Sequence, residues 1–407
     1  MPAAAASNPT LMLVAPFPPT QGPEADKAYY LTRRLAEHGW QVHVVTTRGS
    51  LPVDHPRATV HDVLQNWSWP EESLLASWLE QCRPDAVVEL YIDWLYNYHP
   101  MMTFFPSLAR ALAPGAQMVT VFDDYSHVQP WKQPFAMRLG RNRMKRWAGV
   151  RESDDRYGTL LRDSHRVVVV SQRVGRRLAL HYPGLEAKMH VAPTPSILRL
   201  APADEASRQR RRERLGLAPT DHLLAYFGYL TQEKGVDTLL RALALLCQSR
   251  DDVHLILIGG TIQEPEHLRY AEIMHRLPGQ LGIERLVHWT GAYAFDSDEA
   301  SQFLRAADIC VLPYDNGVCL HNCSFAGAAA HHLPIVTTRG TELEAAFVDR
   351  ENVLLAPPEN PDALASALAL LLDDGQLRER LRTGVAALVR EWFAWDTAIE
   401  RMGLALR

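Results

Sequence analysis

Short apolar runs alternate with amphipathic stretches along the whole chain, which is the pattern of a parallel α/β protein. In the first half the apolar runs predict strands at residues 11–15, 42–46, 86–90, 118–121 and 167–170. The stretches with helical spacing predict helices at residues 27–38, 107–113 and 172–181. This alternation predicts one parallel sheet whose crossovers are helices.

The second half repeats the pattern after a linker over residues 196–207 that contains Pro202. Predicted strands occupy residues 222–227, 254–258, 287–291, 309–312 and 333–337. Predicted helices occupy residues 207–216, 236–246 and 324–332. The chain is therefore expected to form two α/β domains, residues 1–198 and 199–388.

The unit from residue 309 to residue 337 is the best-defined strand, loop, helix, strand crossover. Asp315, Asn316 and Gly317 provide turn chemistry after the first strand, and residues 324–332 are small and helix-prone. In such a unit the loop lies at the carboxyl end of the sheet, and the next helix directs free N–H groups to that edge. An anion is therefore the expected ligand at this edge.

Composition and charge limit the classes of protein to which this chain can belong. The 407 residues are 47% hydrophobic and 22% charged, enough for two cores, and a net charge of -5 argues against a general nucleic-acid binder. Five scattered cysteines suit a reducing cytoplasm. The N-terminal residues lack the pattern of a signal peptide, and no apolar run approaches about 18 residues. We therefore expect a cytoplasmic protein.

The first strand, loop and helix contain no G-x-G-x-x-G, which removes the main support for a hydride-transferring enzyme. The loop instead has Gly22 near its tip. After the strand at 86–90 comes a segment dense in aromatic and polar groups, with Tyr91, Asp93 and Trp94. Such a loop suits stacking on a sugar, and it equally suits an aromatic wall between domains.

Asp123, Asp124 and His127 follow the strand at 118–121. Paired carboxylates at that edge could bind sugar hydroxyls, or one could act as a base if burial raised its pKa. The competing interpretation is a solvated turn, in which aspartate is common.

Residues 138–156, ending at Arg156, combine basic and apolar side chains. The first half of this stretch holds Arg138, Arg141, Arg143, Lys145 and Arg146, with Leu139, Met144 and Trp147 among them and Met137 just before. This composition suits peripheral contact with an anionic membrane, and it also suits an ordinary solvated helix face.

In the second half, residues 228–235 form a glycine-bounded loop with Lys234 at the start of a helix. Glycine lets a backbone approach a ligand closely, and a lysine there supplies a point charge for phosphate. A plain turn with a surface lysine is the alternative. The next two strands end at Gly259-Gly260 and at Gly291, again at the predicted ligand edge.

Six segments of the second half, in this order and spacing, resemble the C-terminal domain of GT-B glycosyltransferases of the family 4, group 1 type. They are FGYLTQEKGVDTLLRALALL, HLILIGG, VHWTGAY, LRAADICVLPY, AAHHLPIVTTRG and ENVLLAPPENPDALASALALLLDD. The resemblance implies two Rossmann-like domains facing a cleft, with the nucleotide sugar held by the second domain and the acceptor by the first. It also implies a last helix, residues 389–407, that crosses back to the first domain, and no metal.

Position by position, Gly228 and Lys234 match the family's glycine and phosphate lysine. Four other family positions are changed: the arginine after the glycine is Tyr229, the two carboxylates spaced eight apart are Cys319 and Gly327, and the first-domain histidine is Phe122. Glu344 receives no role from the resemblance. The predicted donor-binding set is Gly228, Tyr229, Lys234, Gly259, Gly260, Gly291, Tyr293, Asp315, Asn316, Leu320, Asn322 and Ser324, with Leu320 acting through its backbone N–H.

The predicted acceptor-binding residues are Gly22, Tyr91, Asp93 and Trp94, and the predicted catalytic residues are Asp123, Asp124 and His127. Cys319, His321 and Cys323 include zinc-type ligands, but one crowded loop without a second cluster seldom makes a closed site, so no metal or other cofactor is expected.

The sequence predicts an enzyme of the hexosyltransferase type. It would move a sugar from a nucleoside diphosphate sugar to a hydroxyl of a glycan, glycolipid or small molecule, with retention of configuration. The alternative is a non-catalytic protein of the same fold that binds a nucleotide sugar or carbohydrate, or the partner subunit of an active transferase. Neither interpretation includes nucleic acid.

Overall fold

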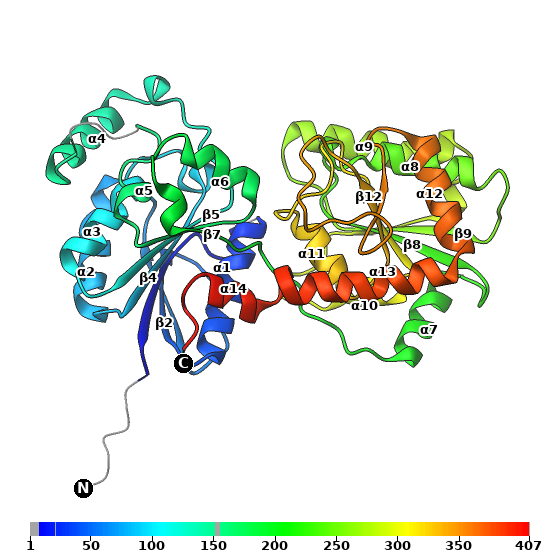
Figure 1. Ribbon diagram of the computed structural model, residues 1–407, viewed down its shortest axis with the longest axis horizontal. Helices are drawn as coiled ribbons and strands as arrows, with labels where there is room; N and C mark the ends of the chain where they lie inside the picture. The colour runs from blue at the N-terminus through cyan, green and yellow to red at the C-terminus, as the bar shows by residue number, and fades with distance from the viewer. Residues whose placement is uncertain (1–7, 21, 151–154, 407) are drawn as a thin grey trace, which may run out of the picture. The chain divides into compact units, whose positions relative to one another are not determined.

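The computed structural model describes residues 8–20, 22–150 and 155–406. Contacts divide these residues into two compact units (Figure 1). The first unit runs to Pro193 and resumes at Trp395, and the second spans Thr194–Ala394. Both are parallel sheets with helices on both faces, so the two-domain α/β fold predicted from the alternating pattern is confirmed.

The first unit has a seven-stranded sheet in the order β3-β2-β1-β4-β5-β6-β7. The strands are β1 (Thr10–Val14), β2 (Gln41–Thr47), β3 (Ala58–Leu64), β4 (Ala86–Tyr91), β5 (Gln117–Phe122), β6 (Arg166–Val169) and β7 (Met189–Val191). The helices are α1 (Pro23–Glu37), α2 (Glu72–Cys82), α3 (Phe105–Leu112), α4 (Phe135–Trp147), α5 (Leu160–Asp163), α6 (Gln172–Ala179) and α14 (Trp395–Arg401). The fully buried β4 is the kind of continuous apolar run that a covered parallel sheet requires.

The second unit has a six-stranded sheet in the order β10-β9-β8-β11-β12-β13. Its strands are β8 (His222–Phe227), β9 (Val253–Ile258), β10 (Val287–Gly291), β11 (Ile309–Leu312), β12 (Ile335–Thr338) and β13 (Leu354–Ala356). Its helices are α7 (Glu205–Arg214), α8 (Val236–Leu246), α9 (Pro265–Gln280), α10 (Glu299–Ala306), α11 (Cys323–Ala329), α12 (Pro361–Asp373) and α13 (Gly375–Leu388).

The end of the chain differs from the single helix expected over residues 389–407. A turn of π-helix covers Val389–Phe393, Ala394 is extended, and α14 then begins at Trp395. The final residues pack within the first unit, where the indole Nε1–H of Trp40 donates to the Leu404 carbonyl at 2.7 Å. None of the helices in the described part of the chain is long and apolar enough to cross a bilayer.

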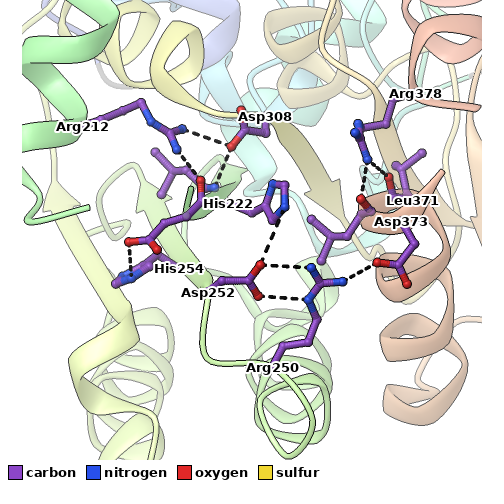
Figure 2. A network of polar contacts seen from close by, with 12 residues as sticks. Arg212, His222, Arg250, Asp252, His254, Asp308, Leu371, Asp373 and Arg378 are labelled. Carbon is purple, nitrogen blue, oxygen red and sulfur yellow. Dashed lines mark hydrogen bonds and ion pairs between the residues drawn. The ribbon is translucent and has the colours of Figure 1, made fainter. Parts of the chain in front are cut away.

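A charged network ties together the amino ends of the second sheet's strands (Figure 2). Asp308, just before β11, accepts from the Leu223 N–H at 2.8 Å and pairs with Arg212 at 3.0 Å. Asp252, just before β9, pairs with Arg250, which also reaches Asp373 at the end of α12. These contacts fix the strand starts to the surrounding helices and leave the carboxyl edge to the loops.

Candidate functional site

Each sheet has one point where the strand order reverses, and the predicted site residues follow the strands at or next to these two points. In the first sheet the order changes between β1 and β4, and in the second between β8 and β11. The loops that follow such neighbouring strands diverge and leave a crevice where ligands of open α/β sheets bind.

In the second unit, the loops after β8 and β9 meet backbone to backbone. Gly228 has φ 142° and donates its N–H to the Ile258 carbonyl at 3.0 Å. Gly259 has φ 135°, and a Cβ there would lie 2.2 Å from the Gly228 oxygen. Glycine is therefore required at Gly259 by both conformation and space.

Lys234 ends a short 3-10 turn, Gln232–Lys234, just before α8. Gly235 follows with φ 66°, and a Cβ there would lie 2.0 Å from the Pro313 carbonyl oxygen, so this turn is held against the end of β11. The Lys234 ammonium lies 5.0 Å from the centroid of the Tyr314 ring. It forms no ion pair with any residue that the structure describes, so its charge is available to a ligand.

Tyr314 connects Lys234 to Ser324 and Gly228. The hydroxyls of Tyr314 and Ser324 lie 2.7 Å apart, and both side chains are buried. A Cβ at Gly228 would lie 3.4 Å from the Ser324 Cβ. The structure thus gathers Gly228, Lys234 and Ser324, three of the predicted donor-binding residues, around one buried tyrosine that sequence reasoning did not select.

Within residues 315–322, several polar groups are already used by the loop itself. The Asn322 Oδ1 accepts from the Cys319 N–H at 2.8 Å. The Leu320 N–H donates to the Glu344 Oε2 at 2.6 Å, and Glu344 is buried. A carboxylate from the segment after β12 therefore supports this loop, a role that the sequence analysis did not assign to Glu344.

Asp315 lies in an acidic part of the same edge. Burial, and then the nearby Asp237, Glu359 and Glu233, raise the pKa of Asp315 to about 6. Carboxylates grouped in this way repel phosphate and suit hydrogen bonds from sugar or ribose hydroxyls. The neighbouring Asn316 is exposed, and its carbonyl is packed against Gly340.

The remaining predicted donor-binding residues lie near the glycine loop. Tyr229 is exposed, and its carbonyl accepts from the Tyr226 hydroxyl at 2.9 Å. Gly260 is packed against Ala292, and Gly291 has φ 69°. The Tyr293 ring stacks near Phe227 at a centroid distance of 6.4 Å.

The changed family positions have distinct surroundings. A Cβ at Gly327 would lie 2.5 Å from a ring carbon of Phe227, so this position has no room for a carboxylate side chain. The Cys319 Sγ lies 3.3 Å from the His321 Nδ1. Among the described residues, no three His, Cys, Asp or Glu side chains are grouped so as to hold a metal ion.

In the first unit, Gly22 brings the loop after β1 next to the loop after β4. Gly22 has φ 137°, and a Cβ there would lie 3.4 Å from the Trp94 ring and 3.1 Å from the Glu24 Oε2. Trp94 is exposed, as a stacking residue must be. Gly22 and Trp94, both predicted acceptor-binding residues, are therefore neighbours.

A buried ion pair and a half-buried acid lie beside them. The Lys27 ammonium pairs with Asp123, and their side chains are 2% and 11% exposed. The Glu24 Oε2 is enclosed without a hydrogen-bond partner in the described part of the chain. Burial, and then the charge of Asp123, raise the pKa of Glu24 to about 7. Of these three residues the sequence selected only Asp123; the missed signal is a lysine on the apolar face of α1, between Ala25 and Leu31.

Asp124 and His127 form a separate, exposed pair. The His127 Nε2 lies 3.2 Å from the Asp124 Oδ2, and both side chains are largely solvent-accessible. The His127 ring packs against Tyr125, over which the Arg177 guanidinium lies at 4.3 Å. The structure therefore separates the three predicted catalytic residues into one enclosed carboxylate and one solvated pair.

Asp93 and Tyr91 are buried. The Asp93 Oδ2 accepts from the Ser126 hydroxyl at 3.0 Å and from the N–H groups of His127 at 2.6 Å and Val128 at 3.1 Å. Tyr91 is packed between the rings of Tyr96 and Phe122. In this structure both residues support the loop on which Asp124 and His127 stand.

Comparison with known proteins defines the class. The model for glycosyl transferases group 1 matches residues 221–374, and the model for glycosyltransferase family 4 matches residues 28–195. The chain thus belongs to the family 4, group 1 glycosyltransferases, and the resemblance stated from the sequence is confirmed.

One of the most similar curated relatives is a D-inositol 3-phosphate glycosyltransferase of Jonesia denitrificans. It is 29% identical over 58% of this chain and 55% of its own length, so the chain spans about half the length of the curated relatives it matches.

Solved structures share the GT-B fold over nearly the whole chain. A glycosyltransferase of Rickettsia africae has a TM-score of 0.69 at 15% identity, covering 97% of this chain and 96% of its own. The HepE protein of Anabaena, solved with UDP and glucose, has a TM-score of 0.65 at 16% identity, covering 97% and 98%.

Proposed function

We propose that this protein transfers a sugar from a nucleoside diphosphate sugar to a hydroxyl acceptor. The observation that carries the proposal is the Lys234 ammonium, which has no ion pair among the described residues and lies at the β8/β11 switch point beside the glycine loop. A lysine point charge and a backbone free of Cβ atoms suit a diphosphate. The UDP and glucose bound by HepE agree with such a ligand.

In this proposal, the second unit stabilises the leaving group. The bond between the anomeric carbon and the diphosphate oxygen breaks, and negative charge grows on the phosphate. Lys234, the Ser324 hydroxyl and backbone N–H groups would meet that charge, without a metal. Asp315 would bind a hydroxyl group because the carboxylates around it disfavour phosphate.

The first unit would bind the acceptor. Trp94 offers an exposed ring for a sugar or polyol face, and Asp124 with His127 offers hydrogen bonds to hydroxyls. Glu24 has a pKa of about 7, which suits a group that accepts a proton from a hydroxyl near neutral pH. In this proposal Asp123 positions Lys27 and sets the charge near Glu24. We also propose that the transfer retains the anomeric configuration.

A thermal-shift screen with UDP, GDP, dTDP and ADP, followed by a transfer assay with the corresponding sugar nucleotides, tests the proposal. A ligand bound only by the native state raises the melting temperature, so one nucleotide should stabilise the protein above the others. The transfer product should keep the donor's anomeric configuration by NMR, and EDTA should leave the rate unchanged. Absence of both nucleotide binding and transfer would overturn the proposal.

A second candidate is a non-catalytic nucleotide-sugar or carbohydrate-binding protein. It is favoured by Gly327, where the Phe227 ring leaves no space for the family's carboxylate, and by Phe122, which is fully buried. Calorimetry followed by product analysis separates the two candidates. Tight nucleotide binding without transfer or donor hydrolysis, across a broad acceptor panel, would favour the binder.

A further inference from the structure

Helix α4 has one face that anchors it to the first unit. Met144 and Arg141 are buried on this face. Gly140 faces the Trp69 ring, and a Cβ there would lie 2.2 Å from the indole Nε1. The helix lies at the periphery of the first unit, away from its sheet (Figure 1).

Large apolar side chains are unusually exposed on α4 and on the short turn that precedes it. Trp131 is 66% exposed, Phe135 78%, Leu139 56% and Trp147 50%. Phe135 and Leu139 are four positions apart in α4 and therefore share one helix face. Trp131 lies in the short 3-10 turn Pro130–Lys132 that precedes the helix. Single exposed apolar residues are normal on a protein surface, but four within residues 131–147 form a group that needs an explanation.

Free positive charges surround this group. Residues 130–149 contain six lysines and arginines and no aspartate or glutamate. Arg141 and Lys145 are directed to Asp155, outside this stretch. Lys132, Arg138, Arg143 and Arg146 are exposed and form no ion pair with other described residues. The exposed side chains of residues 131–147 thus combine cations with large apolar groups.

We propose that Trp131, Phe135, Leu139 and Trp147, together with Lys132, Arg138, Arg143 and Arg146, form a surface that rests on an anionic lipid bilayer. A bilayer interface accepts both kinds of group at once: aromatic and leucine side chains enter the headgroup boundary, and lysine and arginine are attracted to anionic headgroups. A nucleic acid would use the cations and leave Phe135 and Leu139 in water. Positions 151–154, within the basic stretch noted in the sequence, lie outside the described residues and are not part of this surface.

The experiment measures co-sedimentation of the full chain with phosphatidylcholine vesicles, with and without about 30% phosphatidylglycerol, at about 0.1 M salt. Wild type should bind the anionic vesicles and not the neutral ones. The triple variant Lys132→Gln, Arg138→Gln, Arg146→Gln should bind about a hundredfold more weakly, at roughly fivefold per cation. Arg143 is left unchanged because its charge also acts on Glu72.

A matched control removes three exposed arginines from the second unit: Arg210→Gln, Arg214→Gln, Arg241→Gln. It has the same net charge as the α4 triple variant and should bind like wild type. The double variant Phe135→Ser, Leu139→Ser should also lose binding while keeping all cations. Thermal melts equal to wild type would confirm that these exposed substitutions leave the fold intact.

Brominated lipids give an independent readout of insertion. The chain has 10 tryptophans, so quenching is compared between wild type and Trp131→Phe, Trp147→Phe, and the quenched fraction should fall in the variant. Three results would each overturn the proposal: no preference for anionic vesicles, equal losses in the α4 and control triple variants, or unchanged quenching after both tryptophans are replaced.

Discussion

The two sites at the switch points of this protein differ in the groups that line them. The site in the second unit consists of close-packed glycine backbones and buried hydroxyls around one ammonium group without an ion pair in the described part of the chain. The site in the first unit contains a buried lysine and aspartate pair and a carboxyl group whose pKa is shifted to about 7. One site thus offers an ammonium group without an ion pair, whereas in the other the lysine is already paired and an enclosed Glu24 oxygen has no hydrogen-bond partner in the described part of the chain.

Asp123→Asn should produce the largest loss of stability, because it leaves the Lys27 ammonium buried without its partner. Removing one member of a buried pair costs about 3–5 kcal/mol. Urea unfolding measures the change. The exposed neighbour variant Asp124→Asn is the matched control and should stay within about 0.5 kcal/mol. The double variant Lys27→Met, Asp123→Asn should recover most of the loss, and a double variant as unstable as Asp123→Asn would contradict the ion-pair explanation.

Lys234→Ala should lower transfer about 10²- to 10³-fold, the loss typical of removing one group that stabilises transition-state charge. Stability should hardly change, because Lys234 is half-buried and has no ion pair with another described residue. Steady-state kinetics with the preferred sugar nucleotide measure the effect. Arg241→Ala, on the exposed side of the adjoining helix α8, should keep wild-type rates. Wild-type turnover in the Lys234 variant would remove the proposed phosphate contact.

Glu24→Gln should change how stability depends on pH. The pKa of Glu24 is about 7 in the folded chain and near 4.5 when unfolded, so its ionisation opposes folding as pH rises from about 4.5 to about 7. Glutamine cannot ionise, so the variant lacks this destabilisation. At pH 8 its free energy of unfolding should exceed that of wild type by up to about 3 kcal/mol. Urea unfolding at pH 5 and pH 8 measures the difference. Exposed Glu80→Gln should follow the wild-type profile; a similar profile for Glu24→Gln would show that Glu24 ionises freely.

Glu344→Ala should have the smallest effect of the four, about 1–3 kcal/mol of stability, because it leaves the buried Leu320 N–H unsatisfied. The loop over residues 315–322 should then exchange its amide hydrogens faster, which hydrogen-exchange mass spectrometry measures. Glu342→Ala, an exposed residue of the same segment, is the control. Unchanged exchange at Leu320 would show that the loop holds its shape without Glu344.

The fold was largely predictable because buried parallel strands are continuous apolar runs closed by glycine or proline. The strands at residues 222–227, 287–291 and 309–312 have the predicted limits. The edge strand β3 was missed because it is partly exposed and mixes polar with apolar residues. The helix expected over residues 389–407 is interrupted, because Ala394 is extended and α14 begins only at Trp395.

The candidate sites were predictable only where the signal is local. Gly228, Gly259 and Lys234 could be selected because glycine at strand ends and lysine before a helix carry meaning within a few residues. Lys27 and Asp123 are separated by 96 positions, and Leu320 and Glu344 by 24. A contact of that kind depends on the topology of the sheet, so neither residue's own neighbourhood in the sequence identifies its partner.

The charged network at the amino ends of the second sheet's strands (Figure 2) affects which parts of this protein can be exchanged. Asp308 and Asp252 fix the beginnings of β11 and β9. The loops at the carboxyl edge of the sheet therefore contribute little to keeping these strands in register. Loops at that edge, such as residues 315–322, should therefore be exchangeable between homologues without loss of the fold. New ligand preferences could then be selected by changing these loops alone.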